Sequence, residues 1–126
     1  MNTPEDLLYT DEHEWIKRVG DNTVRIGVTD YAQDQLGDVV YVELPESGKE
    51  VVKNDLVVEI ESTKSVGEVY APFPGTVGAV NSSVAETPEL VNTSPYDEGW
   101  LIEIELSAEF SADGLLDATA YKDLTE

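Results

Sequence analysis

Short runs of alternating or β-branched apolar residues, separated by turn residues, fill most of this chain. Runs of this kind are typical of strands in antiparallel sheets, in which one face packs on a core and the other faces water. Gly20-Asp21-Asn22 separates the first two runs and is typical of a hairpin turn. The chain is therefore expected to be mainly β. The predicted strands are Trp15–Val19, Thr23–Val28, Val39–Leu44, Val51–Val52, Leu56–Glu61, Val66–Tyr70, Gly75–Asn81 and Leu101–Leu106.

Two similar sets of strands meet around Lys64. One set covers residues 51–61, and the other covers residues 66–81. The segment Pro72-Phe73-Pro74-Gly75 marks a sharp change of direction in the second set, where Gly75 is expected to be free to adopt a positive φ. This arrangement predicts a flattened two-sheet antiparallel barrel.

Helical signals are few, and they predict short insertions between the strands. Asp30-Tyr31-Ala32-Gln33 places an acid at the N-cap and Gln33 three residues later, and Gly37 marks the end of one short helix. Thr87-Pro88-Glu89-Leu90 is typical of a helical turn with proline at its first position. A C-terminal helix is also expected, because three residues fall at helical spacing after a capping residue. Its capping candidates are Asp117 and Thr119, and its expected buried residues are Ala118, Tyr121 and Leu124.

The length and charge of the chain limit its class of function. A chain of 126 residues fits one domain with a real core. Its 27 acidic residues, against 7 lysines and arginines, give a formal charge of −20, which would repel nucleic acids and anionic membranes. The acids are scattered, as in a solvated shell. Such a shell favours a halophilic source, because concentrated salt screens the self-repulsion.

The absence of certain segments and residues narrows the expectation further. Residues 1–6 carry two acids and no base, unlike a secretory signal or a transit peptide, and no apolar run is long enough to span a bilayer. Because the chain has no cysteine, any redox chemistry would have to come from an attached group. We therefore expect a cytoplasmic, monomeric prokaryotic protein without a membrane partner.

Lys64 stands alone among small polar residues in Glu61-Ser62-Thr63-Lys64-Ser65, where one alternating run ends and another begins. If these runs pair, the lysine lies at the tip of a β-hairpin with its amine in water. The turn lacks the glycine or asparagine of a primed turn, so a type I turn without sequence-specific turn chemistry is expected. Such a lysine is either an ordinary surface residue or the attachment point of a carrier. An amide-linked lipoyl group would supply the redox sulfurs that the chain lacks.

The order and spacing of several motifs resemble the H protein of the glycine cleavage system, nearly from end to end. The resemblance implies a lipoyl- or biotinyl-carrier-like barrel with short helical insertions and a C-terminal helix, in which residues 1–126 form a single lipoyl-carrier domain. The matching blocks are Tyr9-Thr10, His13-Glu14-Trp15, residues 27–33, residues 36–45, residues 61–64, Leu90-Val91-Asn92, Pro95-Tyr96 and Gly99-Trp100. Departures from the usual family residues are Asn54, Thr63, Ser65, Gly67 and Asp97.

What the resemblance implies is a shuttle rather than an enzyme, with lipoic acid bound covalently as lipoyl-lysine at Lys64. A lipoate ligase or lipoyl transferase would attach it, reading Glu61 and Gly75. Glycine decarboxylase (the P protein) would leave an aminomethyl group on this lipoyl-lysine side chain, the arm. A tetrahydrofolate-dependent aminomethyltransferase (the T protein) would remove it. Dihydrolipoyl dehydrogenase (the L protein) would then reoxidise the arm. The alternative is an H-like protein that mainly relays lipoyl groups to other lipoyl domains.

His13 and Glu14 are further candidate site residues. His13 is the only histidine and has no clear third partner, so it is expected to pack or cap rather than to catalyse. The resemblance puts Glu14 near a cleft that shelters the loaded arm, where its carboxylate would hold the aminomethyl amine. The other interpretation of Glu14 is a solvated acid near a strand start. Trp15, Tyr70 and Trp100 are expected to pack in the core.

Three other classes of protein fit these residues less well. A biotin carrier would have methionine on both sides of its lysine, whereas Thr63 and Ser65 flank Lys64. A lipoyl domain of a 2-oxo acid dehydrogenase would lack the His-Glu-Trp and Gly-Trp blocks. An acidic interaction module or nucleic-acid mimic would explain the charge but none of the ordered motifs.

Overall fold

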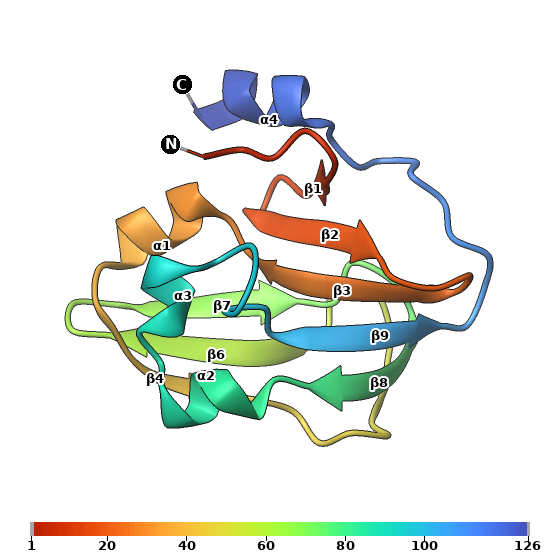
Figure 1. Ribbon diagram of the computed structural model, residues 1–126. Helices are drawn as coiled ribbons and strands as arrows, with labels where there is room; N and C mark the ends of the chain where they lie inside the picture. The colour runs from red at the N-terminus through yellow and green to blue at the C-terminus, as the bar shows by residue number, and fades with distance from the viewer. Residues whose placement is uncertain (1, 126) are drawn as a thin grey trace.

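Two antiparallel sheets pack face to face in a computed structural model (Figure 1). It describes residues 2–125, so the ends of the predicted domain, Met1 and Glu126, lie outside the described residues. The larger sheet has the strand order β1-β2-β3-β9-β8-β5, and the smaller has the order β4-β6-β7. The strands are β1 (Leu8–Tyr9), β2 (Glu14–Arg18), β3 (Thr23–Val28), β4 (Val39–Glu43), β5 (Glu50–Val51), β6 (Leu56–Ser62), β7 (Val66–Tyr70), β8 (Gly75–Val80) and β9 (Ile102–Leu106). The helices are α1 (Asp30–Leu36), α2 (Ser82–Glu86), α3 (Leu90–Thr93) and α4 (Ala118–Thr125).

The predicted mainly β fold, with two antiparallel sheets, short helices and a C-terminal helix, is confirmed. Each predicted strand lies within one residue of its expected ends, and β2 and β3 form the expected hairpin. Strand β1 and helix α2 were not predicted as elements, because such short segments carry too little periodicity.

The main core lies between the sheets and follows from the alternation along each strand. Ile26 and Ile104 of the larger sheet share one cluster with Val42 and Ile60 of the smaller, and none of the four is more than 2% exposed. A second cluster packs α4 against the N-terminal strands, as Figure 1 shows at the top of the molecule. Its buried members are Leu7, Tyr9, Trp15, Ala118 and Tyr121.

The first helix forms as predicted, but its cap differs from the expectation. Thr29 is the N-cap, and its hydroxyl oxygen accepts a hydrogen bond from the Ala32 N–H at 3.1 Å. Asp30 instead accepts one from Gln33 Nε2 at 2.7 Å. Gly37 ends the helix at a φ of 81°. The predicted cap was wrong by one residue because threonine and aspartate both cap helices well.

The C-terminal helix follows the prediction in its cap and in most of its buried face. Asp117 accepts a hydrogen bond from the Ala120 N–H at 2.8 Å. Ala118 and Tyr121 are buried, whereas Leu124 is 51% exposed. The expectation for Leu124 was wrong because helical spacing sets the face on which a residue lies, but not how far the core extends beneath it.

The segment after β8 also differs from the expectation. Asn81 was predicted to end a strand, but it is the N-cap of α2. Its amide donates to the carbonyl oxygens of Glu98 and Trp100 at 2.8 Å and 2.6 Å, so distant residues hold it out of the strand. The predicted turn over residues 87–90 leads into α3, with Pro88 O accepting a hydrogen bond from the Val91 N–H at 3.1 Å.

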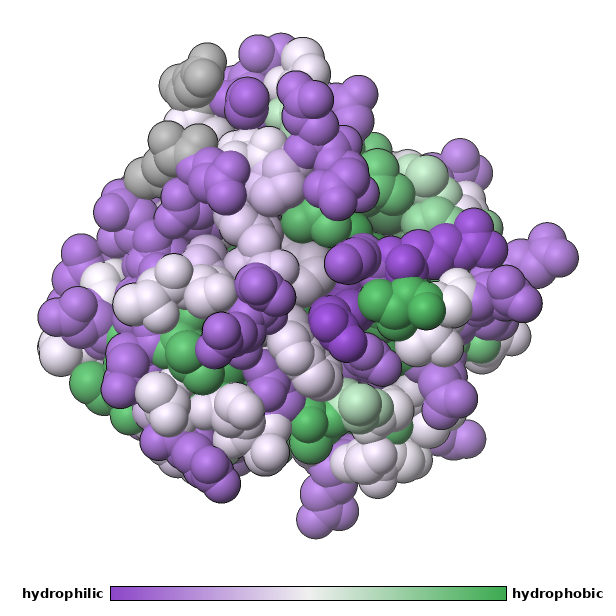
Figure 2. Space-filling model, in the orientation of Figure 1, coloured by the Kyte–Doolittle hydropathy of each residue, from purple (hydrophilic) through white to green (hydrophobic). Residues whose placement is uncertain are grey.

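The surface is dominated by hydrophilic side chains. Figure 2 shows them over most of one face, with small separate hydrophobic patches between them. This distribution agrees with scattered, solvated acidic residues. No helix among residues 2–125 has the length and apolar character needed to cross a membrane.

Candidate functional site

Lys64 lies at the tip of the β6–β7 hairpin, as predicted. Strand pairing ends with Glu61 opposite Val66, and the turn projects from one edge of the molecule below α1 (Figure 1). The lysine is exposed and forms no ion pair with any residue in the described range. Its amine is therefore accessible to solvent and to a modifying enzyme.

Ser62 holds this turn together. Its N–H and its hydroxyl both donate to Ser65 O, at 2.9 Å and 3.0 Å. The hydroxyl oxygen also accepts from the N–H groups of Lys64 and Ser65, at 3.3 Å and 3.0 Å. None of the residues of the turn has a positive φ, which excludes a primed turn and a type II turn. The expectation of a turn without sequence-specific chemistry was wrong, because a serine side chain organises it.

The base of the turn is anchored to the segment between α1 and β4. The Thr63 N–H donates to Asp38 O at 3.0 Å. The Lys64 stem packs on Gly37, where a Cβ would lie 3.1 Å from Lys64 Cε. Asn92 of α3 donates to Gly37 O at 2.9 Å and accepts from the first N–H of β4 at 2.9 Å. Sequence reasoning treated Gly37 only as a helix stop and Asn92 only as part of a motif, so it missed their support of Lys64.

A cavity of about 360 Å³ opens between α1 and β7, next to this hairpin. Gly67 keeps the cavity open, because a Cβ there would come within 2.9 Å of Leu36 Cδ2. Gly67 follows Lys64 by three residues on the same hairpin, so the cavity begins about 10 Å from Lys64 at about 3.3 Å per strand residue. The polar side chains in its wall are Glu12, His13, Glu14, Tyr31, Gln35 and Glu68.

Glu14 is the buried carboxylate of this cavity, with only 3% of its surface exposed. It accepts hydrogen bonds from the Tyr70 N–H at 2.7 Å and from the Thr10 hydroxyl at 3.2 Å. Burial raises the pKa of Glu14 from 4.5 to about 7, and the nearby charges of Glu12 and Asp11 act in the same direction, against the two hydrogen bonds. The interpretation of Glu14 as a solvated acid was therefore wrong.

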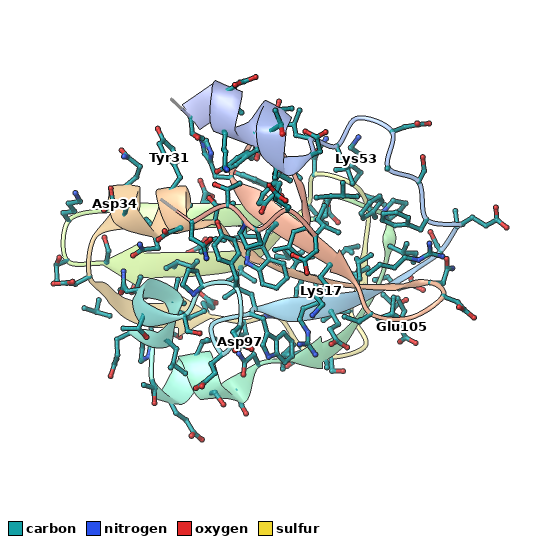
Figure 3. The ribbon with its side chains drawn as sticks, turned by 45° about the horizontal axis from the view of Figure 1, so that its top comes forward. Lys17, Tyr31, Asp34, Lys53, Asp97 and Glu105 are labelled. Atoms are coloured by element: carbon teal, nitrogen blue, oxygen red, sulfur yellow. The ribbon has the colours of Figure 1, made fainter. Side chains whose placement is uncertain are left out.

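Glu14 also borders a second cavity, of about 460 Å³. Lys53 lines the second cavity and Tyr31 lines the first, and the two side chains lie on opposite sides of the view in Figure 3.

Tyr70 was expected in the core, but it is half-buried and lines the second cavity, because its strand ends there. Trp15 is fully buried and Trp100 packs against its cluster, as expected.

His13 packs in the wall of the first cavity, as expected. Its ring centroid lies 4.8 Å from that of Tyr31, and Nδ1 lies 2.8 Å from Tyr121 Oη. Burial lowers the pKa of His13, while Asp11 and Glu12 raise it. The imidazole is therefore a partly buried, hydrogen-bonded group rather than a free base.

The two expected recognition residues lie in different parts of the fold. Glu61 is exposed on β6 beside the lysine turn. Gly75 opens β8, which begins at the edge opposite that turn (Figure 1). Gly75 does not use the positive φ that it was expected to be free to adopt. Glycine is needed there for packing, because a Cβ would collide with Glu105 O of β9.

Comparison with known proteins agrees with this geometry. A family model described as glycine cleavage H-protein matches residues 7–126. The glycine cleavage system H protein of Mycolicibacterium smegmatis is 52% identical over 122 residues, which cover 94% of this chain and 93% of that protein. The H protein of Micrococcus luteus is 56% identical over 119 residues, with coverage of 94% and 93%.

A solved structure extends the similarity to three dimensions. The crystal structure of a glycine cleavage system H protein from Mycobacterium marinum matches with a TM-score of 0.85 and 38% sequence identity. The match covers 95% of this chain and 96% of that chain. The chain therefore belongs to the glycine cleavage H-protein family, whose members are carrier components and not enzymes, as the sequence motifs predicted.

Proposed function

We propose that this protein is the lipoyl-bearing shuttle of the glycine cleavage system, and that its lipoyl group is attached to Lys64. The supporting observation is an exposed lysine on a turn that hydrogen bonds hold in place, beside a cavity lined by a buried carboxyl group. Gly37 leaves space for the lysine stem, so the turn fits an extended side chain. When bound, the lipoyl group supplies a disulfide that accepts two electrons together with a carbon unit.

We assign the loaded arm to the first cavity. Leu36 and Val69 provide an apolar wall for the hydrocarbon part of the arm. Glu14 accepts a charge-assisted hydrogen bond from the ammonium of the aminomethyl group, the cargo of the arm. A nearby cation also favours the ionised form of a carboxyl group whose pKa is raised to about 7. The cavity therefore prefers the loaded, cationic arm to the empty, neutral arm.

The partners follow from this role. Glycine decarboxylase loads the arm, the tetrahydrofolate-dependent aminomethyltransferase unloads it, and dihydrolipoyl dehydrogenase reoxidises it. A lipoate ligase or lipoyl transferase attaches the lipoyl group. It recognises Glu61 beside the turn directly, and it recognises Gly75 indirectly, through the position of the β8 strand. We infer a single carrier domain over residues 1–126, monomeric and located in the cytoplasm of a prokaryote, in line with its bacterial relatives. We also propose a halophilic source, and the formal charge of −20 supports it.

Substitution of Lys64 tests the proposal. In a system reconstituted from the four proteins, Lys64→Arg is expected to carry no lipoyl mass increment and to abolish glycine decarboxylation. Its melting temperature should not change, because the side chain is exposed. Lys53→Arg, at another exposed lysine, is the control and should keep both properties.

Full activity of Lys64→Arg would refute the assignment of the attachment site. A wild-type protein that donates lipoyl groups to other lipoyl domains, but supports no glycine-dependent chemistry, would instead favour the relay function. Intact mass of the protein from its own source, with the increment mapped to the Lys64 peptide, tests the attachment directly.

A further inference from the structure

We propose that the hydroxyl of Tyr121 joins the two walls of the arm cavity and so positions Glu14, an inference that rests on the proposed function. Tyr121 lies on α4, and its Oη is 2.8 Å from His13 Nδ1 and 2.7 Å from Thr29 Oγ1. His13 and Glu14 belong to the segment that forms one wall of the cavity, and Thr29 caps α1, which forms another wall. One hydroxyl group from the C-terminal helix therefore bridges both walls.

The segment that carries Glu14 needs such support. His13 has a φ of 70°, a left-handed conformation that is uncommon outside glycine and persists where surrounding contacts hold it. Its N–H donates to Thr10 O at 3.2 Å, and its carbonyl oxygen accepts from the Thr29 N–H at 3.1 Å. The Tyr121 bridge adds a side-chain link to this backbone link. Because Glu14 follows His13 directly, the direction of its side chain depends on this conformation.

The hydrogen bonds around Tyr121 require a particular direction. Thr29 Oγ1 accepts from the Ala32 N–H, and Thr29 is fully buried, so its hydroxyl hydrogen needs an acceptor. Tyr121 Oη is the neighbour that can accept it. The Tyr121 hydroxyl then donates to His13 Nδ1, which must carry no proton. The chain runs from Thr29 to Tyr121 to His13, and it requires a neutral imidazole with its proton on Nε2.

The surroundings of the imidazole favour this state. Burial lowers the pKa of His13 and raises the pKa of Tyr121, so near neutral pH the imidazole is uncharged and the phenol keeps its proton. The titratable side chains that face His13 or share its cavity are Asp11, Glu12 and Glu14 from its own segment, Tyr31 from α1, Tyr121 from α4 and Glu68 from β7.

The structure offers a closely matched control for Tyr121. Tyr9 stacks on Tyr121 with ring centroids 4.7 Å apart, and both rings are at most 1% exposed. The Tyr9 hydroxyl donates to Pro4 O at 2.6 Å, and Tyr9 lies outside the cavity wall. Tyr121→Phe and Tyr9→Phe therefore each remove one hydroxyl from the same stack, but only Tyr121→Phe breaks the bridge.

The first test uses NMR of the unmodified protein, whose single histidine gives an unambiguous signal. The ¹⁵N shifts should show a neutral imidazole protonated on Nε2 in the wild type. In Tyr121→Phe the pKa of His13 should rise, because the neutral form loses its hydrogen-bond donor, whereas Tyr9→Phe should leave it unchanged. A proton on Nδ1 in the wild type, or equal titration in both variants, would overturn the proposal.

The second test measures retention of the cargo by the lipoylated protein after loading by glycine decarboxylase. In water the cargo is lost by hydrolysis. The methylene carbon gains oxygen from water, its bonds to sulfur and nitrogen break, and a thiol, formaldehyde and ammonium form without net oxidation. We expect formaldehyde release to be about fivefold faster in Tyr121→Phe than in Tyr9→Phe, the factor that one lost neutral hydrogen bond corresponds to.

A second variant separates positioning from folding. His13→Asn keeps a residue that tolerates positive φ but removes the ring. If both residues act through one bridge, Tyr121→Phe combined with His13→Asn should release cargo no faster than the faster single variant. Additive effects in the double variant, or equal release by Tyr121→Phe and Tyr9→Phe, would overturn the proposed role of the Tyr121 bridge. Either result would leave the proposed carrier function intact. A wild-type protein that cannot be loaded would overturn the proposed function, and this inference with it.

Discussion

Glu14→Gln tests whether the arm cavity contains a carboxyl group that the fold keeps neutral. Burial, the largest cause, raises the pKa of Glu14 from 4.5 to about 7. A carboxyl group whose pKa is raised in the folded state contributes its full stability below the unfolded pKa, and this contribution is lost as the pH rises through the folded pKa. At about 1.4 kcal/mol per pH unit, the loss between pH 4.5 and 7 is roughly 3 kcal/mol.

Glutamine keeps the shape of a protonated glutamate but does not titrate, and its carbonyl oxygen can still accept from the Tyr70 N–H. Urea unfolding of the unlipoylated protein should therefore show that Glu14→Gln gains stability relative to the wild type as the pH rises from 5. The relative gain should reach roughly 3 kcal/mol near pH 8 and then stay constant. This is a large fraction of the ~5–15 kcal/mol that stabilises a typical domain.

Glu68→Gln is the matched control, because it removes an exposed charge from the same cavity and Glu68 is not among the charges that raise the pKa of Glu14. Its stability should stay within about 0.5 kcal/mol of the wild type at each pH, as for most surface substitutions. Parallel stability curves for the wild type and Glu14→Gln over this pH range would refute the reasoning, because Glu14 would then have similar pKa values in the folded and unfolded states.

Three further predictions concern the lysine turn and the charge of the surface. Gly37→Ala should cost about 1–2 kcal/mol in urea unfolding, because its φ is positive, and should slow lipoylation by crowding Lys64. Gly48→Ala shares the positive φ but meets no neighbour within 4 Å, so equal lipoylation rates in both variants would contradict a role of the Gly37 contact. Ser62→Ala should speed hydrogen exchange of the turn amides, whereas Ser65→Ala should not, because the described residues make no hydrogen bond to the Ser65 hydroxyl. The melting temperature should rise from low to molar KCl if the acidic surface is an adaptation to salt, and a flat or falling curve would contradict a halophilic source.

Much of the fold could be predicted from the sequence because strands and turns depend on local alternation and on a few special residues. Errors occurred where a distant segment competes for a local group. Asn81 leaves its strand because it bonds to the carbonyl oxygens of residues 98 and 100. Gly75 is needed because of the neighbouring β9 backbone and not because of its own φ. Leu124 has the right spacing, but no core beneath it.

The sequence by itself determined the two-sheet architecture, the hairpin that displays Lys64 and membership of the family, since these depend on patterns of neighbouring residues and on the order of motifs. Only the tertiary structure decided that Glu14 is buried, because burial depends on segments that meet in space. The same holds for Gly37 beneath the Lys64 stem and for Tyr121 between the cavity walls. The sequence positions of Tyr121 and His13 differ by 108 residues, and no local pattern encodes a hydrogen bond over that separation.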